Sequence, residues 1–385
     1  MAAMEKNNKT LNVPNLRFPE FCGEWERDTL QSVATLLKGT GISKDQLSEE
    51  GQSCILYGEL YTKYRSEIID TIISKTDIDP KRLVRSQTND VIIPCSGESA
   101  VDIATARCVK QSDVLLGGDL NIIRLKGEHD GSFFAYQLNG KRKYDIAKVA
   151  QGVSVVHLYG EHLKGVKVNY PSAAEQKKIS SLLALIDQRI ETQKKIIEKY
   201  ESLIRGLYHS VFNQPASTLQ LKDVVSVVKG KQVNGEELLE YGKYYVMNGG
   251  IEPSGYLDVC NTPANTISIS EGGNSCGYVQ YNTEPFWSGG HCYSLIQKGQ
   301  SVNYQYLYHF LKYKERDIMA LRIGSGLPNV QKKDLERFEI RVLPTKQQNR
   351  VTDILEDVSV KCDLEKRILQ GWQCQKSYLL RNLFI

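Results

Sequence analysis

A heptad pattern that occurs twice constrains the fold of this chain more than any other feature. The first copy, which begins "EQKKISSLLALIDQRI", follows Pro171 and runs to Phe212, with apolar residues at nearly every seam position. Ser172 and Glu175 have the spacing of a helix-capping box. Sustained heptads are typical of a coiled coil. At about 1.5 Å per residue, a helix of ~40 residues is roughly 60 Å long.

The second copy follows Pro344 and ends at Phe384. Its seam is less regular, because Glu365 and Lys376 stand at positions that are apolar in a regular heptad. The two copies keep a constant offset of 172 residues, which is the separation of Phe212 and Phe384. The residues expected in the seam between the helices are Leu183, Ile190, Ile197, Ile204, Leu355, Leu369, Trp372 and Leu383.

The repeat extends into the sequence that precedes each helix. Both copies contain a Lys-Gly pair, Lys38-Gly39 and Lys229-Gly230, at the same place in a matching segment. The chain is therefore interpreted as a tandem duplication in which a domain is followed by a helix twice. The matching segments are 30–47 with 221–238, 89–98 with 264–273, 115–125 with 286–296, and 152–168 with 326–340.

Each duplicated domain is expected to be α+β and rich in loops. Short runs such as "LNIIRL" (120–125) and "NTISIS" (265–270) contain β-branched residues between turn-forming residues, which predicts strands. The clearest helix inside a domain is "YQYLYHFLKYKERDIMAL" (304–321). The expected divisions are a tail at 1–17, a domain at 18–170, a helix at 171–213, a domain at 214–343 and a helix at 344–385.

Composition excludes several classes of protein. The chain has 385 residues, of which 41% are hydrophobic and 24% are charged, as in globular proteins of two or three domains. It lacks an apolar run of ~18 residues and an apolar signal core, so we expect a cytoplasmic protein. Its nine cysteines form no C-x-x-C pair, which favours reduced thiols. A net charge of +4 permits binding to nucleic acid without requiring it.

Motifs for catalysis are missing from the sequence. It contains no G-x-x-x-x-G-K-[ST] phosphate-binding loop, no G-x-S-x-G elbow, no H-E-x-x-H pair and no N-P-P-Y stretch. Segment 268–277, "SISEGGNSCG", is interpreted as a β-turn with an irregular loop rather than a nucleophile site. We therefore expect no cofactor, no bound metal and no catalysis by this chain alone.

Basic and amide side chains in loop-like segments favour a nucleic-acid surface. A single lysine is more often a solvated charge, so the prediction depends on the set. Loops 150–158 and 320–330 are the expected readout loops, because polar side chains there flank residues that permit close backbone approach. The candidate DNA-binding residues are Lys38, Arg85, Arg107, Lys110, Gln151, His157, Lys229, Lys231, Asn274, Arg322, Ser325, Asn329 and Lys332.

The layout and the helix starts resemble the specificity subunit of type I restriction-modification systems. The helix start P-x-x-x-E-Q-x-x-I occurs in "PSAAEQKKI" (171–179), and a degenerate copy, one residue shorter and with Gln for Glu, occurs in "PTKQQNRV" (344–351). The resemblance implies two tandem α+β target-recognition domains, each reading half of a split sequence in double-stranded DNA. It also implies an antiparallel coiled coil that acts as a spacer and holds two modification (methyltransferase) subunits, which in turn recruit ATP-dependent restriction subunits.

Two other functions remain open at this stage. The chain could be a non-catalytic coiled-coil scaffold that binds proteins through its end domains. It could also be a self-sufficient nuclease or methyltransferase, which the missing motifs make the least favoured. We also hypothesise that partner subunits cover Glu365 and Lys376, the two charged residues in the second seam.

Overall fold

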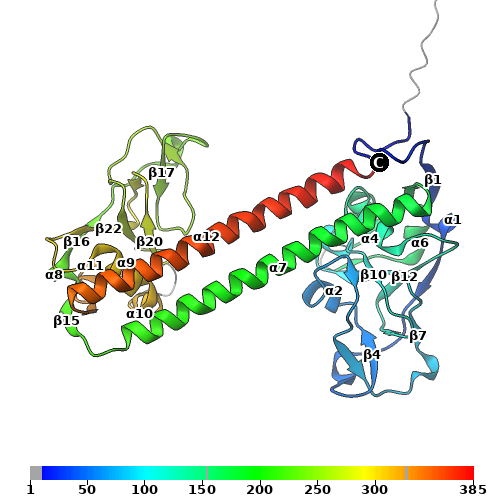
Figure 1. The fold of residues 1–385 in the computed structure, drawn as a ribbon, viewed down its shortest axis with the longest axis horizontal. Coiled ribbons are helices and arrows are strands. Elements are labelled where there is room, and N and C mark those ends of the chain that lie inside the picture. Colours follow the sequence, from blue (N-terminus) through cyan, green and yellow to red (C-terminus); the bar gives the residue numbers. More distant parts are fainter. Residues whose placement is uncertain (1–10, 153–154, 325, 327) are drawn as a thin grey trace, which may run out of the picture. The chain divides into compact units, whose positions relative to one another are not determined.

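The computed structural model describes residues 11–152, 155–324, 326 and 328–385. They form two compact units: the first contains the chain up to Lys194 together with Ile368–Ile385, and the second contains Lys195–Arg367. Two long helices, α7 (Ala173–Phe212) and α12 (Thr345–Asn382), each contribute residues to both units (Figure 1). Within the described residues, no helix is long and apolar enough to cross a membrane.

Helix α7 begins and ends where the heptad pattern predicted. Pro171 disfavours helical geometry in the residue before it, and the hydroxyl of Ser172 accepts a hydrogen bond from the N–H of Glu175 at 3.4 Å. The Glu175 carboxylate accepts from the guanidinium of Arg17 at 2.8 Å and from the indole N–H of Trp25 at 3.3 Å. The cap therefore also joins the start of α7 to the segment at the beginning of the chain.

The two long helices run antiparallel. In the first unit, Leu183 and Ile190 of α7 share a core with Leu383, which follows the end of α12. In the second unit, Phe212 at the end of α7 shares a core with Leu355 near the start of α12. Of the predicted seam residues, Leu183, Ile190, Ile197, Leu355 and Leu383 are buried, and Ile204, Leu369 and Trp372 are half-buried.

The first unit contains two five-stranded sheets. The central strand of the first sheet, β8 (Asp90–Pro94), is buried along its whole length, which explains its run of apolar residues. The first sheet has the order β2 (Ala34–Lys38), β12 (Leu120–Leu125), β8 (Asp90–Pro94), β10 (Arg107–Val109) and β5 (Ile68–Ile69). The second has the order β3 (Leu47–Ser48), β6 (Ser74–Thr76), β4 (Gln52–Ile55), β11 (Leu115–Leu116) and β7 (Val84–Arg85).

The second unit repeats the order of the first four strands of the first sheet. Its larger sheet has the order β16 (Val225–Lys229), β22 (Cys292–Gln297), β19 (Thr266–Ser270) and β20 (Val279–Asn282). The pairs β2–β12–β8–β10 and β16–β22–β19–β20 are antiparallel throughout. Lys38 lies opposite Asn121 in the first sheet, and Lys229 lies opposite Tyr293 in the second. The segments matched by sequence therefore occupy equivalent strands, which confirms the duplication.

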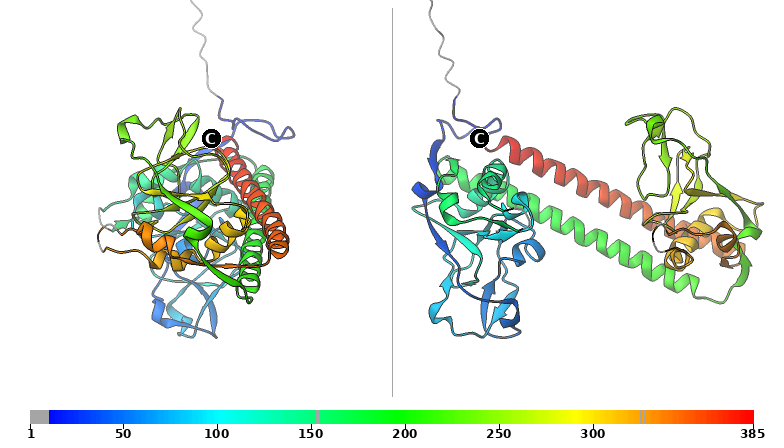
Figure 2. Two further views of the ribbon diagram at one scale, coloured as in Figure 1. Left: turned by 90° about the vertical axis from the view of Figure 1, so that its left-hand side faces the viewer. Right: turned by 180° about the vertical axis from the view of Figure 1, so that it is seen from behind.

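In each domain, a strand near the beginning also pairs with a strand near the end. In the first unit β1 (Glu26–Thr29) pairs with β14 (Lys167–Tyr170), and in the second β15 (Ser217–Gln220) pairs with β23 (Glu339–Val342). The remaining strands are β9 (Ser96–Gly97), β13 (Val156–His157), β17 (Tyr244–Met247), β18 (Tyr256–Leu257) and β21 (Trp287–Ser288). Figure 2 shows the same elements from two further directions.

The helices inside the domains correct one prediction. The expected single helix at 304–321 is two helices, α9 (Tyr304–Tyr313) and α10 (Glu315–Ala320), separated at Lys314. Lys314 has φ −92° and ψ 11°, outside helical geometry. The first unit has the matching pair α4 (Gly131–Asn139) and α5 (Lys143–Val149). The short helices are α1 (Leu30–Val33), α2 (Glu59–Thr62), α3 (Ala100–Ile103), α6 (Gly160–Lys164), α8 (Leu221–Val224) and α11 (Lys332–Glu336).

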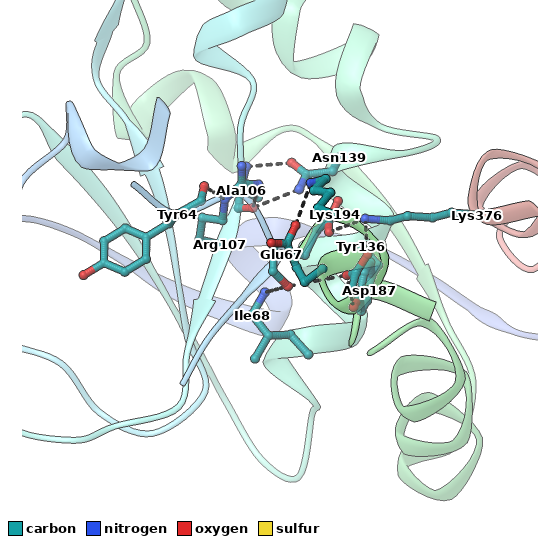
Figure 3. A network of polar contacts seen from close by, with 12 residues as sticks. Tyr64, Glu67, Ile68, Ala106, Arg107, Tyr136, Asn139, Asp187, Lys194 and Lys376 are labelled. Atoms are coloured by element: carbon teal, nitrogen blue, oxygen red, sulfur yellow. Dashed lines mark hydrogen bonds and ion pairs between the residues drawn. The ribbon is translucent and has the colours of Figure 1, made fainter. Parts of the chain in front are cut away.

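Lys376 of α12 lies in a buried polar network of the first unit (Figure 3). Its ammonium is 2.6 Å from Oε2 of Glu67 and 2.7 Å from Oδ1 of Asp187, a residue of α7. The hydroxyl of Tyr136 donates to the other Asp187 oxygen at 2.7 Å. The hypothesis that partner subunits cover Lys376 is wrong, because carboxylates of the same chain surround this charge.

The charges in this network determine its titration. Burial alone would raise the pKa of Glu67, but the Lys376 ammonium and the Arg107 guanidinium hold it below its usual value. Burial and the neighbouring Glu67 charge raise the pKa of Asp187. Burial lowers the pKa of Lys376, but the two carboxylates more than offset this and raise it on balance. The Lys376 ammonium is therefore the positive charge that compensates both buried carboxylates.

Candidate nucleic-acid interface

Equivalent Lys-Gly pairs stand at the ends of β2 and β16. The N–H of Gly39 donates to the carbonyl of Leu120 at 2.9 Å, and the N–H of Gly230 donates to the carbonyl of Cys292 at 2.9 Å. A Cβ atom would lie 2.0 Å from a backbone oxygen at Gly39 and 2.2 Å at Gly230. Only glycine fits such a close approach of two backbones. The preceding lysines, Lys38 among them, are exposed at the end of the sheet.

The two expected readout loops share one backbone arrangement. Gln151 and His157 exchange backbone hydrogen bonds at 2.9 and 2.7 Å, and Ile323 and Asn329 do the same at 2.8 and 3.0 Å. Each pair closes the base of a loop. Residues 153–154, 325 and 327, near the middle of these loops, lie outside the described residues, and so the candidate Ser325 cannot be placed. The correspondence between the two loops inferred from the sequence is confirmed.

Both loops attach to the end of an equivalent central strand. The N–H of Leu158 donates to the carbonyl of Cys95 at 2.9 Å, directly after β8. The N–H of Val330 donates to the carbonyl of Glu271 at 2.8 Å, directly after β19. In each unit, the loop base and the strand end therefore lie together. This arrangement places polar loop residues beside a rigid sheet, which is how many binding sites are built.

In the second unit, several candidates gather around Glu271. The Lys229 ammonium is 2.7 Å from Oε1 of Glu271, and the hydroxyl of Tyr293 donates to the same oxygen at 2.9 Å. The ring of His291, which is exposed, lies with Nδ1 3.7 Å from Oε2. Asn329 joins the group through a backbone bridge to Gly272. In this cluster, the buried carboxylate of Glu271 therefore lies next to exposed side chains that carry nitrogen atoms.

The predicted DNA-binding residues differ in how freely they could reach a ligand. The structure leaves seven of them exposed, and these face solvent in or beside the loops and strand ends. The exposed set is Lys38, Gln151, Lys229, Lys231, Asn274, Arg322 and Lys332, and the half-buried set is Arg85, Lys110, His157 and Asn329.

Four of the candidates have side-chain hydrogen bonds within the first unit, and one of them is His157, whose Nδ1 lies 3.3 Å from the hydroxyl of Ser96. Arg107 is 9% exposed, and its guanidinium donates to the carbonyls of Tyr64 and Ala106 at 3.2 and 3.0 Å (Figure 3). Arg85 donates to a side-chain oxygen and a backbone carbonyl, and Lys110 donates to the side chain of Asn89 at 2.9 Å. These side chains already have partners within the protein. Because Arg107 is also buried, it is not part of the proposed DNA interface.

A pocket of about 730 Å³ beside the first loop has a different character. Its lining includes Tyr61, Glu98, Asp102 and Val155. Two carboxylates oppose the approach of phosphate, so this pocket is not the expected contact surface for a DNA backbone. In the part of the chain that the structure describes, no cluster of His, Cys, Asp or Glu could hold a metal ion.

Sequence reasoning missed Glu271, His291 and Tyr293. Segment 268–277 contains a turn at 274–277, as predicted, but its first three residues belong to β19, which stops at Ser270. The alignment of 89–98 with 264–273 was the available signal, because it sets the residues that follow the two central strands side by side. Pairing Glu271 with Lys229 required the β16–β22–β19 order, which local sequence does not encode.

The sequence matches one family along most of its length. The sequence profile of the family described as "Type I restriction modification DNA specificity domain" matches residues 23–202 and again residues 214–371. The two matches together cover both units of the structure.

Curated relatives show the same layout. A protein of Mycoplasma genitalium named as a type I specificity subunit is 23% identical over 378 residues, covering 94% of each chain. A protein of Mycoplasma pneumoniae, named in the same way, is 24% identical over 312 residues, covering 76% of this chain and 78% of that protein.

Solved structures agree on the fold. The crystal structure of a type I restriction-modification S subunit from M. genitalium superposes with a TM-score of 0.74 at 22% identity, covering 97% of this chain and 99% of that one. A chain from a study of complex assembly in a type I restriction-modification system has a TM-score of 0.53 at 13% identity, with 94% and 97% covered. At these identities the similarity concerns the fold.

Proposed function

Because the chain belongs to the family of type I restriction-modification DNA specificity domains and carries two of them, we propose that each unit reads one half of a split DNA sequence. The observation that carries the proposal is the duplicated interface. In both units an exposed lysine, a closed polar loop and the end of a central strand meet in the same backbone arrangement. Two equivalent surfaces are what a bipartite target requires.

The contact chemistry supports a role in binding DNA. Exposed lysines and Arg322 supply phosphate contacts, which give affinity and register. Gln151, His157 and Asn329 supply groups that pair with base edges in a groove. The helices α7 and α12 act as the spacer in this proposal, so that bases between the two half-sites are read only through DNA shape.

The chain is proposed to be non-catalytic and to work with partner subunits. Two modification (methyltransferase) subunits would bind the helices, and ATP-dependent restriction subunits would join them. Exposed apolar side chains on the long helices support such docking, since Leu185 is 59% exposed, Val360 68% and Leu364 54%. No cofactor is assigned to this chain, and a cytoplasmic location is the expected one for a complex that acts on cellular DNA.

Methylome sequencing tests the proposal directly. Cells would express the full chain together with its modification subunit, and a matched culture would express the modification subunit alone. The expected result is a split methylated motif with a fixed gap that appears only when the chain is present. Methylation without a motif, or the same motif in both cultures, would contradict the proposal.

The salt dependence of DNA binding distinguishes the proposed function from the alternative, a scaffold whose end domains bind proteins. If the chain reads DNA, the logarithm of the binding constant should fall linearly with the logarithm of salt concentration, with a slope of about −0.9 for each phosphate contacted. If the end domains bind proteins instead, DNA binding should be weak and should lack a preferred sequence. The measurement uses the purified complex with labelled duplexes that contain or lack the motif.

A further inference from the structure

The residues after the two central strands, Cys95 and Glu271, occupy the same position in the duplicated fold. The N–H of Cys95 donates to the carbonyl of Asp119 at 2.7 Å, and the N–H of Glu271 donates to the carbonyl of His291 at 2.8 Å. The carbonyl of each residue accepts a hydrogen bond from the N–H of the first residue after a readout loop. The backbone is thus the same in both units, whereas the side chains around the lysine differ. Glu271, His291 and Tyr293 of the second unit stand where Cys95, Asp119 and Asn121 stand in the first.

Glu271 restrains the side chain of Lys229 through an ion pair. The carboxylate is 12% exposed, whereas the Lys229 side chain is 53% exposed, and the two groups are 2.7 Å apart. The hydroxyl of Tyr293 donates to the same carboxylate oxygen at 2.9 Å and thereby holds it in place. One N–H of the ammonium is therefore used inside the protein, and the rest of the group faces outward.

Lys38 has no such support. The side chain at the equivalent position is the thiol of Cys95, and burial raises its pKa to about 11, so it is uncharged at neutral pH. Among the described residues no carboxylate forms an ion pair with the Lys38 ammonium. No carboxylate therefore fixes the direction of this ammonium.

The two arrangements suit different DNA groups. A free lysine is a mobile point charge, which favours contact with a phosphate regardless of sequence. A lysine fixed by a carboxylate has lost most of its net attraction for phosphate, but it presents two remaining N–H donors in a defined direction. Those donors match O6 and N7 of guanine, the acceptor pair that guanine displays in the major groove.

We propose that Lys229, fixed by Glu271, reads a guanine in the half-site of the second unit, whereas Lys38 contacts a phosphate in the half-site of the first. Lys229 is thus a specificity-determining residue, and Glu271 is a positioning residue that acts through it. This inference rests on the proposed function, because it assigns a base to a surface that is proposed to bind DNA.

The test compares three variants of the full chain in complex with the modification subunit. Glu271→Gln keeps the shape of the side chain and removes the charge that restrains Lys229. Lys229→Gln removes the ammonium itself. Lys38→Gln is the matched control at the equivalent position of the first unit. Each variant is measured by methylome sequencing and by salt titration of its binding to non-cognate duplex DNA.

The wild-type motif should contain a guanine in one half, and its preference over the other bases should fall roughly tenfold or more in Glu271→Gln and in Lys229→Gln. The other half should not change. In Glu271→Gln the freed lysine should steepen the salt slope by about 0.9, whereas in Lys38→Gln the slope should become shallower by about 0.9 with an unchanged motif.

Each alternative has its own result. If the wild type yields no split motif, the proposed function itself fails. If the wild type yields a motif and Lys229→Gln leaves it unchanged, the assignment of Lys229 is overturned whatever Glu271→Gln does. If Glu271→Gln loses the motif without steepening the salt slope, Glu271 supports the fold rather than positioning the lysine. Should Glu271→Gln fail to fold, Lys229→Gln, whose side chain is half exposed, decides the question.

Discussion

At the residue scale, the duplicated domains fill one buried position with two different side chains. Tyr136 and His309 stand at the same place in α4 and α9, and each makes a hydrogen bond to α7. Tyr136 donates to Asp187 at 2.7 Å, whereas Nδ1 of His309 lies 3.0 Å from the hydroxyl of Tyr208. Burial lowers the pKa of His309 to about 4. The second unit therefore contains a histidine that folds in its neutral form.

This histidine should make the second unit sensitive to acid. Its pKa is lower in the folded state than the usual 6.5, so the unfolded chain binds more protons between about pH 6.5 and pH 4, and stability falls as the pH falls through that window. The contribution is at most roughly 3.5 kcal/mol, at about 1.4 kcal/mol per pKa unit. Chemical denaturation of His309→Gln and of the wild type should show a smaller loss of stability on acidification in the variant. Equal pH profiles would refute the assignment.

The glycine of the Lys-Gly pair gives a second prediction at this scale. In Gly230→Ala the new methyl group would meet a backbone oxygen at 2.2 Å, and we expect a loss of about 1–3 kcal/mol, as for other overpacked sites. Gly235→Ala is the matched control, because a Cβ at Gly235 meets nothing within 4 Å. Urea denaturation of both variants measures the difference. A Gly230→Ala variant as stable as the control would show that the two backbones can separate.

At the scale of elements, the long helices were the most predictable part of the fold. Proline, the cap at Ser172 and the heptads are all local signals, and they predicted both ends of α7 to within two residues. The sheets were only partly predictable, because strand order depends on contacts between distant segments. The break at Lys314 was missed because an uninterrupted run of helix-forming residues surrounds it.

Lys376 shows most clearly what local sequence could not reveal. In the heptad pattern it is simply a charge at an apolar position, and its partner Glu67 lies 309 residues earlier in the chain. The candidate binding site was limited in the same way. The loops and the Lys-Gly pairs were found from the repeat, whereas the contact between Lys229 and Glu271 depends on three strands being brought together.

Removing Lys376 should be costly. Lys376→Ala would leave the carboxylates of Glu67 and Asp187 without their ammonium in a buried site, which we expect to cost about 3–5 kcal/mol. Lys366→Ala on the same helix is the matched control, since its pair with Glu201 at 3.0 Å is formed by side chains that are 46% and 41% exposed. The control should lose less than about 1 kcal/mol. Similar losses in thermal denaturation would mean that the network is not tightly coupled.

At the scale of the whole molecule, the chain uses the central part of one plan twice. The sheet order, the paired helices and the loop attachment recur, while the side chains at equivalent positions differ, as Cys95 and Glu271 do. A repeated scaffold with different side chains gives two surfaces of similar geometry and different chemistry. This combination is what a target with two unlike halves requires.

The helices set the number of unread bases in this proposal, and their length can be altered. Inserting four residues, about one helical turn, into both α7 and α12 at equivalent seam positions keeps most of the heptad pairing. The gap in the methylated motif should lengthen, while both half-sites stay the same. Methylome sequencing of cells that express the extended chain gives the answer. A motif with the original gap would show that something other than the helices sets the spacing.

The strand pairs β1–β14 and β15–β23 have a consequence for how such chains diversify. Each pair brings the beginning and the end of a domain together, immediately before the long helix that follows it. A domain whose ends meet can be exchanged for a foreign one without disturbing its surroundings. Genetic exchange within the codons of the long helices would therefore replace one reader at a time, and a lineage could acquire a new DNA preference in a single recombination event.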